Sequence, residues 1–158
     1  MAVGTSANPI LFTSIHDDYG CGVGVNGEST CDTYSDQDTR APQQGDWGYI
    51  RFGPDSDDSS IVSYAEIRYS GSNLGIDIND GAIYLDNASP TLSKISFMEN
   101  YINGAELRGR IGWTTTSWSN TDVVYVLEEG DITVPMTDTL TVGAGTVIKI
   151  GNHSNINV

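Results

Sequence analysis

The last third of the chain, residues 121–158, carries an apolar repeat that restricts which folds are available. Apolar side chains come there in pairs two residues apart, and each pair follows the previous one by eight residues. Side chains two apart lie on one face of a strand, whereas apolar positions on a helix recur at three, four and seven. We therefore expect five short strands separated by corners, with these pairs buried: Val124 and Val126, Ile132 and Val134, Leu140 and Val142, Ile148 and Ile150, and Ile156 and Val158.

Two chain courses fit such short strands, a meander of hairpins or a coil that turns the same way at every corner. Hairpins of this length would overlap by only two or three residues, which is too little to hold a register. In a coil, three strands and three corners make one turn of about 24 residues, and successive turns stack as parallel sheets. The spacing therefore favours a coil.

The middle of the chain contains an internal repeat of two apolar triples. The first triple is Gly48, Ile50 and Phe52, and it recurs as Gly81, Ile83 and Leu85. The second is Val62, Ala65 and Ile67, and it recurs with the same internal gaps as Leu92, Ile95 and Phe97. A weaker third copy begins with Asn103, Ala105 and Leu107. Matched triples in the same order indicate equivalent, stacked turns.

Composition and charge exclude several classes of function. The chain has 158 residues, which suits one domain, and 18 glycines, which suit many turns. It has no apolar window long enough to span a membrane, and Met1–Asn8 lacks the features of a signal peptide, so we expect a mature chain or a segment of a longer one. A net charge of −14 disfavours binding to nucleic acid or to anionic membranes.

Residues 16–45 form a long loop rich in Asp and Gly, which predicts a function or a fixing device. Cys21 and Cys31, the two cysteines of the chain, could close it by a disulfide worth about 3 kcal/mol. An oxidised pair would indicate a location outside the cytosol.

The same loop offers ligands for a metal ion. Calcium prefers carboxylate and carbonyl oxygens, and we expect a possible calcium site among Asp17, Asp18, Glu28, Asp32, Asp36 and Asp38. The alternatives are a partial zinc shell made by His16 with the two cysteines, or a solvated acidic loop without a metal.

Several stretches carry a resemblance to a known family: NPILFTSIHDDYG, GDWGYIRF, SYAEIRYSG, GAIYLDNASPTLSKISF and GDITVPMTDTLTVGAGTVIKI. They resemble the rungs, or successive turns, of right-handed parallel β-helix proteins of the pectate-lyase-like superfamily. The likeness is nearest to the non-catalytic repeats of secreted and surface proteins. It implies an all-β, right-handed parallel β-helix of about five to six rungs, a single β-solenoid domain over residues 1–158 with the long loop 16–45 inserted, outside the cell or on its surface.

The residues that catalyse reactions in this superfamily are mostly missing here. Asn120, Thr121 and Asp122 match the first motif of the related polygalacturonases, but the later motifs do not follow, so we expect no enzyme. Trp113 and Trp118 flank a Thr- and Ser-rich run that could contact a glycan, or else they cover the core. Asn152 begins a sequon and is a possible glycosylation site.

The order of the stretches is rotated relative to the resembling family, because GDITVPMTDTLTVGAGTVIKI closes this chain and MAVGTSANPILFTS opens it. We therefore expect uncapped terminal rungs that pair with another copy, head to tail, through Met1, Ala2, Val3, Ile148, Ile150, Ile156 and Val158. The leading hypothesis is a structural subunit or repeat unit of an extracellular fibre or surface filament, with calcium as a possible cross-link. The alternatives are a β-helix that binds or cleaves polysaccharide, and a passive spacer of a larger secreted protein.

Overall fold

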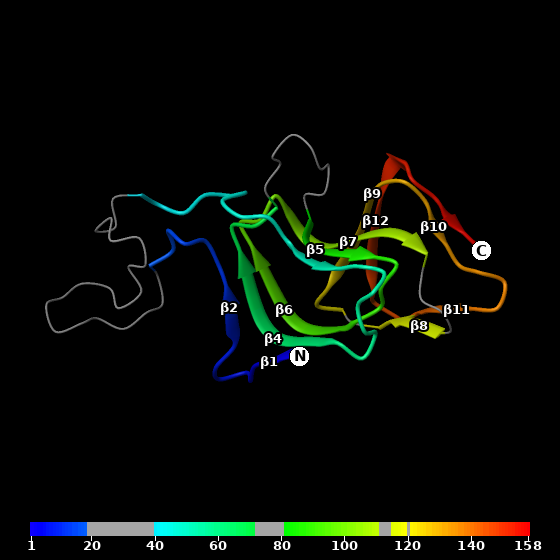
Figure 1. The fold of residues 1–158 in the computed structure, drawn as a ribbon, viewed down its shortest axis with the longest axis horizontal. Helices are drawn as coiled ribbons and strands as arrows, with labels where there is room; N and C mark the ends of the chain where they lie inside the picture. Colours follow the sequence, from blue (N-terminus) through cyan, green and yellow to red (C-terminus); the bar gives the residue numbers. More distant parts are fainter. Residues whose placement is uncertain (19–39, 72–80, 111–114, 120) are drawn as a thin grey trace, which may run out of the picture.

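The computed structural model describes residues 1–18, 40–71, 81–110, 115–119 and 121–158, and this part of the chain is all-β (Figure 1). No helix long and apolar enough to cross a membrane occurs in these ranges. The strands are β1 (Ala2–Val3), β2 (Ile10–Phe12), β3 (Ile50–Phe52), β4 (Ile61–Arg68), β5 (Gly81–Asp86), β6 (Thr91–Met98), β7 (Ile102–Arg110), β8 (Thr115–Trp118), β9 (Val124–Glu129), β10 (Ile132–Thr133), β11 (Thr139–Val142), β12 (Val147–His153) and β13 (Ile156–Asn157).

The largest sheet, called the long sheet below, contains seven strands that pair in parallel. Its main row runs β3, β5, β7, β9 and β12. Two short strands extend it at one side, because β10 pairs with the last residues of β7 and β13 pairs with β10.

A second sheet is built around β4, which pairs in parallel with β6 along its whole length. Because β6 occupies that entire edge, β1 and β2 share the other edge, where β1 pairs with Val62 and Ser63 and β2 with residues 65–67. In the part of the chain that the structure describes, a third sheet contains β8 and β11 alone, again parallel. Parallel pairing of strands joined by short connections excludes a meander of hairpins.

Register confirms the internal repeat that the sequence predicts. Ile50 and Phe52 lie opposite Ile83 and Leu85, which in turn lie opposite Ala105 and Leu107. In the sheet around β4, the second triple is also in register, with Val62, Ala65 and Ile67 opposite Leu92, Ile95 and Phe97. Nearer the end of the chain, Ile132 pairs with Ile156 and Thr115 with Thr139, which fits the expected turn of about 24 residues.

The predicted burial of the apolar pairs is wrong at several positions. Val142, Ile150 and Val158 are exposed, at 47%, 52% and 102%. The face that β9 buries also differs from the prediction. In β9 the buried side chains are Tyr125 and Leu127, whereas Val124 and Val126 are half-buried on the other face. The stretch VVYVL is apolar at every position, so its periodicity does not fix which face is buried. Pairing fixes it, because Tyr125 and Leu127 stand opposite Ile148 and Ile150. A shift of one residue moves every side chain of a strand to the opposite face.

Asn100 holds the corner between β6 and β7 to the end of β4. Its side chain is 1% exposed, and its Oδ1 accepts hydrogen bonds from the Ser70 amide at 2.9 Å and the Ser70 hydroxyl at 2.7 Å. Its Nδ2 donates to the Ile67 carbonyl at 2.8 Å and to Asn103 Oδ1 at 3.0 Å. One buried amide therefore satisfies backbone groups of the neighbouring turn, which would otherwise be buried without partners.

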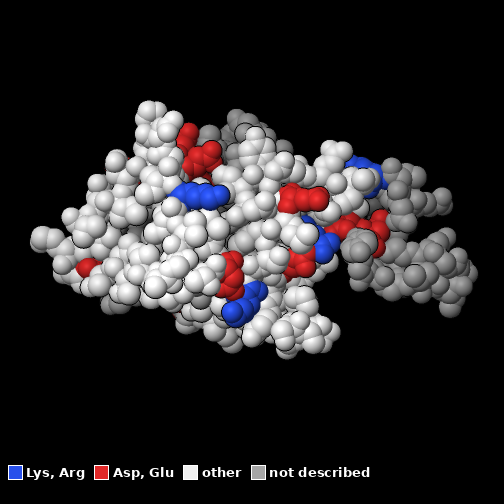
Figure 2. Space-filling model, turned by 180° about the vertical axis from the view of Figure 1, so that it is seen from behind, with Lys and Arg blue, Asp and Glu red and all other residues white. Residues whose placement is uncertain are grey.

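Basic side chains on the face seen in Figure 2 mostly lie beside acidic ones. In the long sheet, Arg51 of β3 forms an ion pair with Asp86 of β5 at 2.6 Å. Its guanidinium also lies 5.7 Å from the centre of the Tyr84 ring, and the guanidinium of Arg108 lies 5.9 Å from the same centre. Arg51 and Arg108 are thus used in contacts between neighbouring strands of the long sheet.

Candidate functional site

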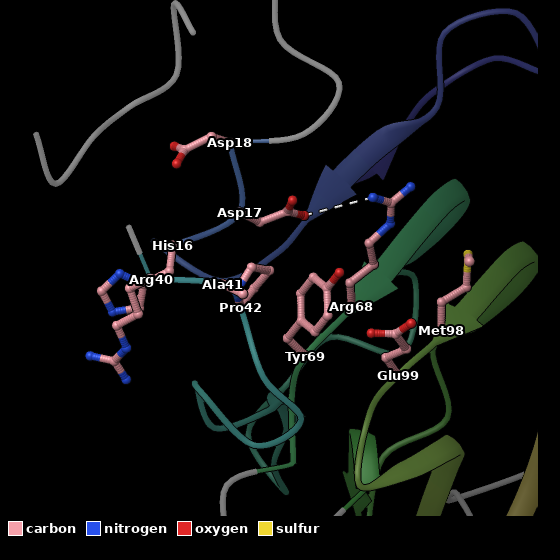
Figure 3. A pocket seen from close by; sticks show the side chains of 10 residues that line it. All are labelled: His16, Asp17, Asp18, Arg40, Ala41, Pro42, Arg68, Tyr69, Met98 and Glu99. Carbon is pink, nitrogen blue, oxygen red and sulfur yellow. Dashed lines mark ion pairs between the residues drawn. The ribbon is translucent and has the colours of Figure 1, made fainter. Parts of the chain in front are cut away.

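Two places in the described residues have the character of a site, a pocket at one corner and an open sheet edge. The pocket, called the corner pocket below, has a volume of about 530 Å³ (Figure 3). It lies where β2, β4 and β6 end, because the carboxyl ends of neighbouring parallel strands meet at one edge. Side chains that line it include His16, Asp17, Arg40, Arg68, Tyr69 and Glu99.

Asp17 is the most enclosed acid of the corner pocket, with its side chain 1% exposed. Its carboxylate accepts a hydrogen bond from the Thr13 hydroxyl and lies 3.7 Å from a guanidinium nitrogen of Arg68. Arg68 also pairs with Glu66, and this hydrogen bond, together with the negative charge of Asp17, raises the pKa of Arg68 above its usual value. One guanidinium therefore lies between two carboxylates beside the pocket, and the group keeps a net negative charge.

Tyr69 and Glu99 stand at equivalent corners and both have a left-handed backbone, with φ of 61° and 53°. Tyr64 and Lys94 repeat this pattern inside the paired strands β4 and β6, with φ of 48° and 53°. Left-handed residues therefore recur in neighbouring strands as part of the architecture. Burial raises the pKa of the Tyr69 hydroxyl, and the carboxylates of Asp17 and Glu99 add to this effect.

The structure bears only partly on the predicted calcium ligands. Asp17 and Asp18 both line the corner pocket, but the Asp17 carboxylate is directed at Thr13 and Arg68. Within the described ranges no group of three or more acidic, His or Cys side chains is placed to hold a metal ion. The other expected ligands, Glu28, Asp32, Asp36 and Asp38, lie outside the described residues, as do Cys21 and Cys31. Calcium and the disulfide stay predictions.

The two tryptophans expected as possible glycan contacts have different outcomes. Trp118 is 4% exposed and stacks on Tyr125 with ring centroids 4.8 Å apart, so its ring belongs to the core and offers no face to a sugar. Trp113 lies outside the described residues. Asn152, the possible glycosylation site, is exposed in β12.

The second candidate site is the β12 edge of the long sheet. In the described residues β12 pairs only with β9, β13 only with β10, and β11 only with β8. Ile150 lies opposite the fully buried Leu127, yet it is 52% exposed. Ile148 and Ile156, two other predicted assembly residues, are only partly buried against the core, and Val158 is exposed. Among the described residues, this edge thus combines unpaired backbone groups with apolar side chains that no further strand covers.

The opposite edge is formed by β3 in the long sheet and by β1 and β2 in the sheet around β4. Within the described residues each of these strands pairs on one side only. Met1, Ala2 and Val3, the other predicted assembly residues, belong to this end, where Met1 and Val3 are exposed.

Sequence reasoning missed Arg68, Tyr69 and Glu99 as members of the corner pocket. A signal was present, because Tyr69 and Glu99 each stand two residues after an expected apolar triple, those ending at Ile67 and Phe97. Equivalent turns place such residues side by side.

Comparison with known proteins gives no relative for this chain. No protein-family model, no curated protein and no solved structure matches it.

Proposed function

We propose that the chain winds as a right-handed parallel β-helix and acts as a structural unit that stacks end to end with other copies, forming an extracellular fibre or surface filament. The order of strands along the chain supports the coil. From β3 to β9, strands of the long sheet alternate with strands of the other two sheets. β10 then extends the long sheet, β11 lies in the third sheet, and β12 returns to the main row. A chain that returns to one sheet in the same direction each time fits successive turns, and such parallel crossovers are nearly always right-handed.

The observation that carries the stacking proposal is the pair of free edges of the long sheet. Its outer strands in the main row are β3 and β12, and all five strands of that row run in one direction. A second copy placed along the sheet would therefore bring its β3 parallel to β12 of the first. Each junction would leave another β12 free, so that this head-to-tail contact repeats without closing.

Partial burial of apolar side chains at the β12 edge also supports a second copy of the chain as its partner. Ile148 and Ile150 stand on the core side of β12, where each further turn of a solenoid would cover them. Ile50 and Phe52 of β3 stand on the core side at the other edge and are also only partly buried. Joining two copies would therefore bury apolar surface from both partners.

The test compares two substitutions on β12 that place the same charge on opposite faces. Ile150→Asp puts a carboxylate on the core-facing side and Val147→Asp puts it on the outer side. The two native side chains are similarly exposed, at 52% and 45%, so both variants should fold. Sedimentation velocity over a range of concentrations should show assembly of the unmodified chain and of Val147→Asp, but a loss of at least about tenfold in assembly for Ile150→Asp. Equal assembly of both variants would contradict the proposal.

Polysaccharide binding is the second candidate function, and the corner pocket is the observation that favours it. Tyr69 offers an aromatic ring, while Glu99 and Arg40 offer hydrogen-bonding groups at the same pocket. Screening of neutral and acidic glycans for binding, and for new reducing ends, should then give a signal that Tyr69→Ala abolishes. Absence of any glycan signal with the unmodified chain would remove this candidate.

A further inference from the structure

We infer that copies join in one register, with Ile148 and Ile150 of β12 opposite Ile50 and Phe52 of the next copy, and that ionic strength controls this junction. The inference rests on the proposed stacking function and adds which residues meet. It follows from the columns of the long sheet, a column being the residues that stand opposite one another in successive strands.

The core-facing columns define the register. One column contains, in strand order, Ile50, Ile83, Ala105, Tyr125 and Ile148. A second begins with Phe52, Leu85 and Leu107 and reaches β12 with Leu127 and Ile150. If the next copy continues both columns, its Ile50 follows Ile148 and its Phe52 follows Ile150.

Other registers match the two edges less well. A shift of one residue would direct the apolar side chains of one strand away from the core. A shift of two residues in one direction would set Ile148 opposite Gly48 and Phe52 opposite Asn152. The same shift in the other direction would set Ile150 opposite Pro54, which has no amide hydrogen to donate to a parallel neighbour. Only the continued columns pair both apolar residues of each edge.

This register has a consequence on the outer face of the sheet. The outer column that begins at Arg51 continues through Tyr84, Glu106 and Val126 to Lys149. Continued into the next copy, it sets Lys149 opposite Arg51. Like charges directly opposite across a strand pair are destabilising. Lys149 forms no ion pair within 4.0 Å among the described residues, whereas Arg51 is paired with Asp86 at 2.6 Å. The Asp86 carboxylate therefore offsets part of the repulsion, on the Arg51 side only.

Salt should therefore promote assembly, because it screens exposed charges. The net charge of −14 on each copy acts in the same direction, so salt dependence alone does not identify the register. Reversing the charge of Lys149 does identify the register, because the general repulsion between copies and the local contact with Arg51 then change in opposite directions. Lys149→Glu makes each copy more negative, which increases general repulsion, but it replaces the Lys–Arg contact by an attractive Glu–Arg contact.

The matched control is Lys94→Glu, which changes the net charge by the same amount. Lys94 is exposed on β6, in a different sheet from the junction. At low salt, Lys149→Glu should lower the concentration needed for assembly by about threefold to tenfold. Lys94→Glu should leave it unchanged or raise it. If Lys149→Glu raises it as much as Lys94→Glu does, the register is wrong.

Cross-linking between two variants tests the register directly. Copies carrying Arg51→Cys are mixed with copies carrying Lys149→Cys under oxidising conditions, and the linked peptides are identified by mass spectrometry. Neighbouring strands lie about 4.8 Å apart, within the reach of a disulfide. We expect the 51–149 link between copies. As the control for a register shifted by two residues, Val147→Cys replaces Lys149→Cys and should give little product.

The outcomes separate the register from the proposed function. Assembly of the unmodified chain together with a dominant 51–147 link would overturn the register and leave end-to-end stacking intact. Absence of assembly of the unmodified chain at every concentration and salt level would overturn both.

Discussion

Strands β9 and β12 are neighbours in the long sheet, yet their core-facing residues differ sharply in exposure. Leu127 of β9 is fully buried, while Ile150, directly opposite in β12, is 52% exposed. Both residues are large and aliphatic and both belong to the same face. The difference arises because β9 is paired on both sides, whereas β12 is paired on one side only in the described residues. Exposure at this edge therefore follows from pairing on one side only in the described residues.

The β3 edge differs from the β12 edge in how much of it is covered. Trp47, just before β3, packs against the core, and its Nε1 donates a hydrogen bond to the Arg68 carbonyl at 2.7 Å. Ile50 and Phe52 are partly buried, and neither is among the strongly exposed apolar residues. The strands at the two edges run in the same direction, but the apolar side chains of β3 are better covered than those of β12. Two unlike edges suit a head-to-tail contact better than a symmetric one.

The largest expected effect comes from shortening the two opposite residues to alanine. Leu127→Ala should lower the free energy of unfolding by about 3 kcal/mol, because it leaves a cavity in a fully packed site. Ile150→Ala should cost less than about 1 kcal/mol in the unassembled chain, because much of its surface is already in water. Urea denaturation of both variants at low concentration measures the difference. Equal losses would show that β12 is covered in solution.

Asn100 provides the next largest effect. Asn100→Ala would leave the Ser70 amide and the Ile67 carbonyl without their partner, and we expect a loss of about 2 kcal/mol. Asn103→Ala is the control, since Asn103 is exposed and accepts hydrogen bonds from Asn100, so its loss should cost less. A loss for Asn100→Ala no larger than for Asn103→Ala, again by urea denaturation, would show that the corner does not depend on the buried amide.

Tyr125 gives a pH-dependent effect in the covered part of the sheet. Burial, aided by the charge of Asp122, raises the pKa of its hydroxyl to about 12. Because an unfolded tyrosine ionises near pH 10, its contribution to stability is complete below pH 10 and is lost as the pH rises towards 12. We expect a late ionisation step in an ultraviolet absorbance titration, which Tyr125→Phe removes. A step that persists in this variant would assign it to another tyrosine.

The smallest effect concerns the attachment of β13 to β10. Hydrogen bonds from Asn155 and Asn157 lower the pKa of the Asp131 carboxyl. The lowered pKa of Asp131 contributes to the stability of the folded chain at neutral pH. This contribution is lost as the pH falls below 3.8 and through the pKa of Asp131 in the folded state. An NMR titration of the Asp131 carboxyl should show this low value, and Asn155→Ala should return it towards 3.8. An unchanged titration in that variant would exclude Asn155 as a cause.

The sequence predicted the parts of the fold that repeat. The triples at Ile50 and Val62 are in register with their copies, because parallel strands with the same apolar pattern pair with equivalent residues opposite one another. It failed at β9, where every residue of VVYVL is apolar and the buried face is selected by pairing with β7 and β12. It also missed Arg68, because a role in the corner pocket depends on three strands that end side by side.

The central claim is that the long sheet continues from copy to copy, and X-ray fibre diffraction from a concentrated, aligned sample tests it most directly. Five strands per copy at about 4.8 Å each predict an axial repeat of about 24 Å together with a strong 4.8 Å reflection along the fibre axis. Aligned assemblies without the 4.8 Å axial reflection, or a chain that stays monomeric at every concentration, would contradict the account.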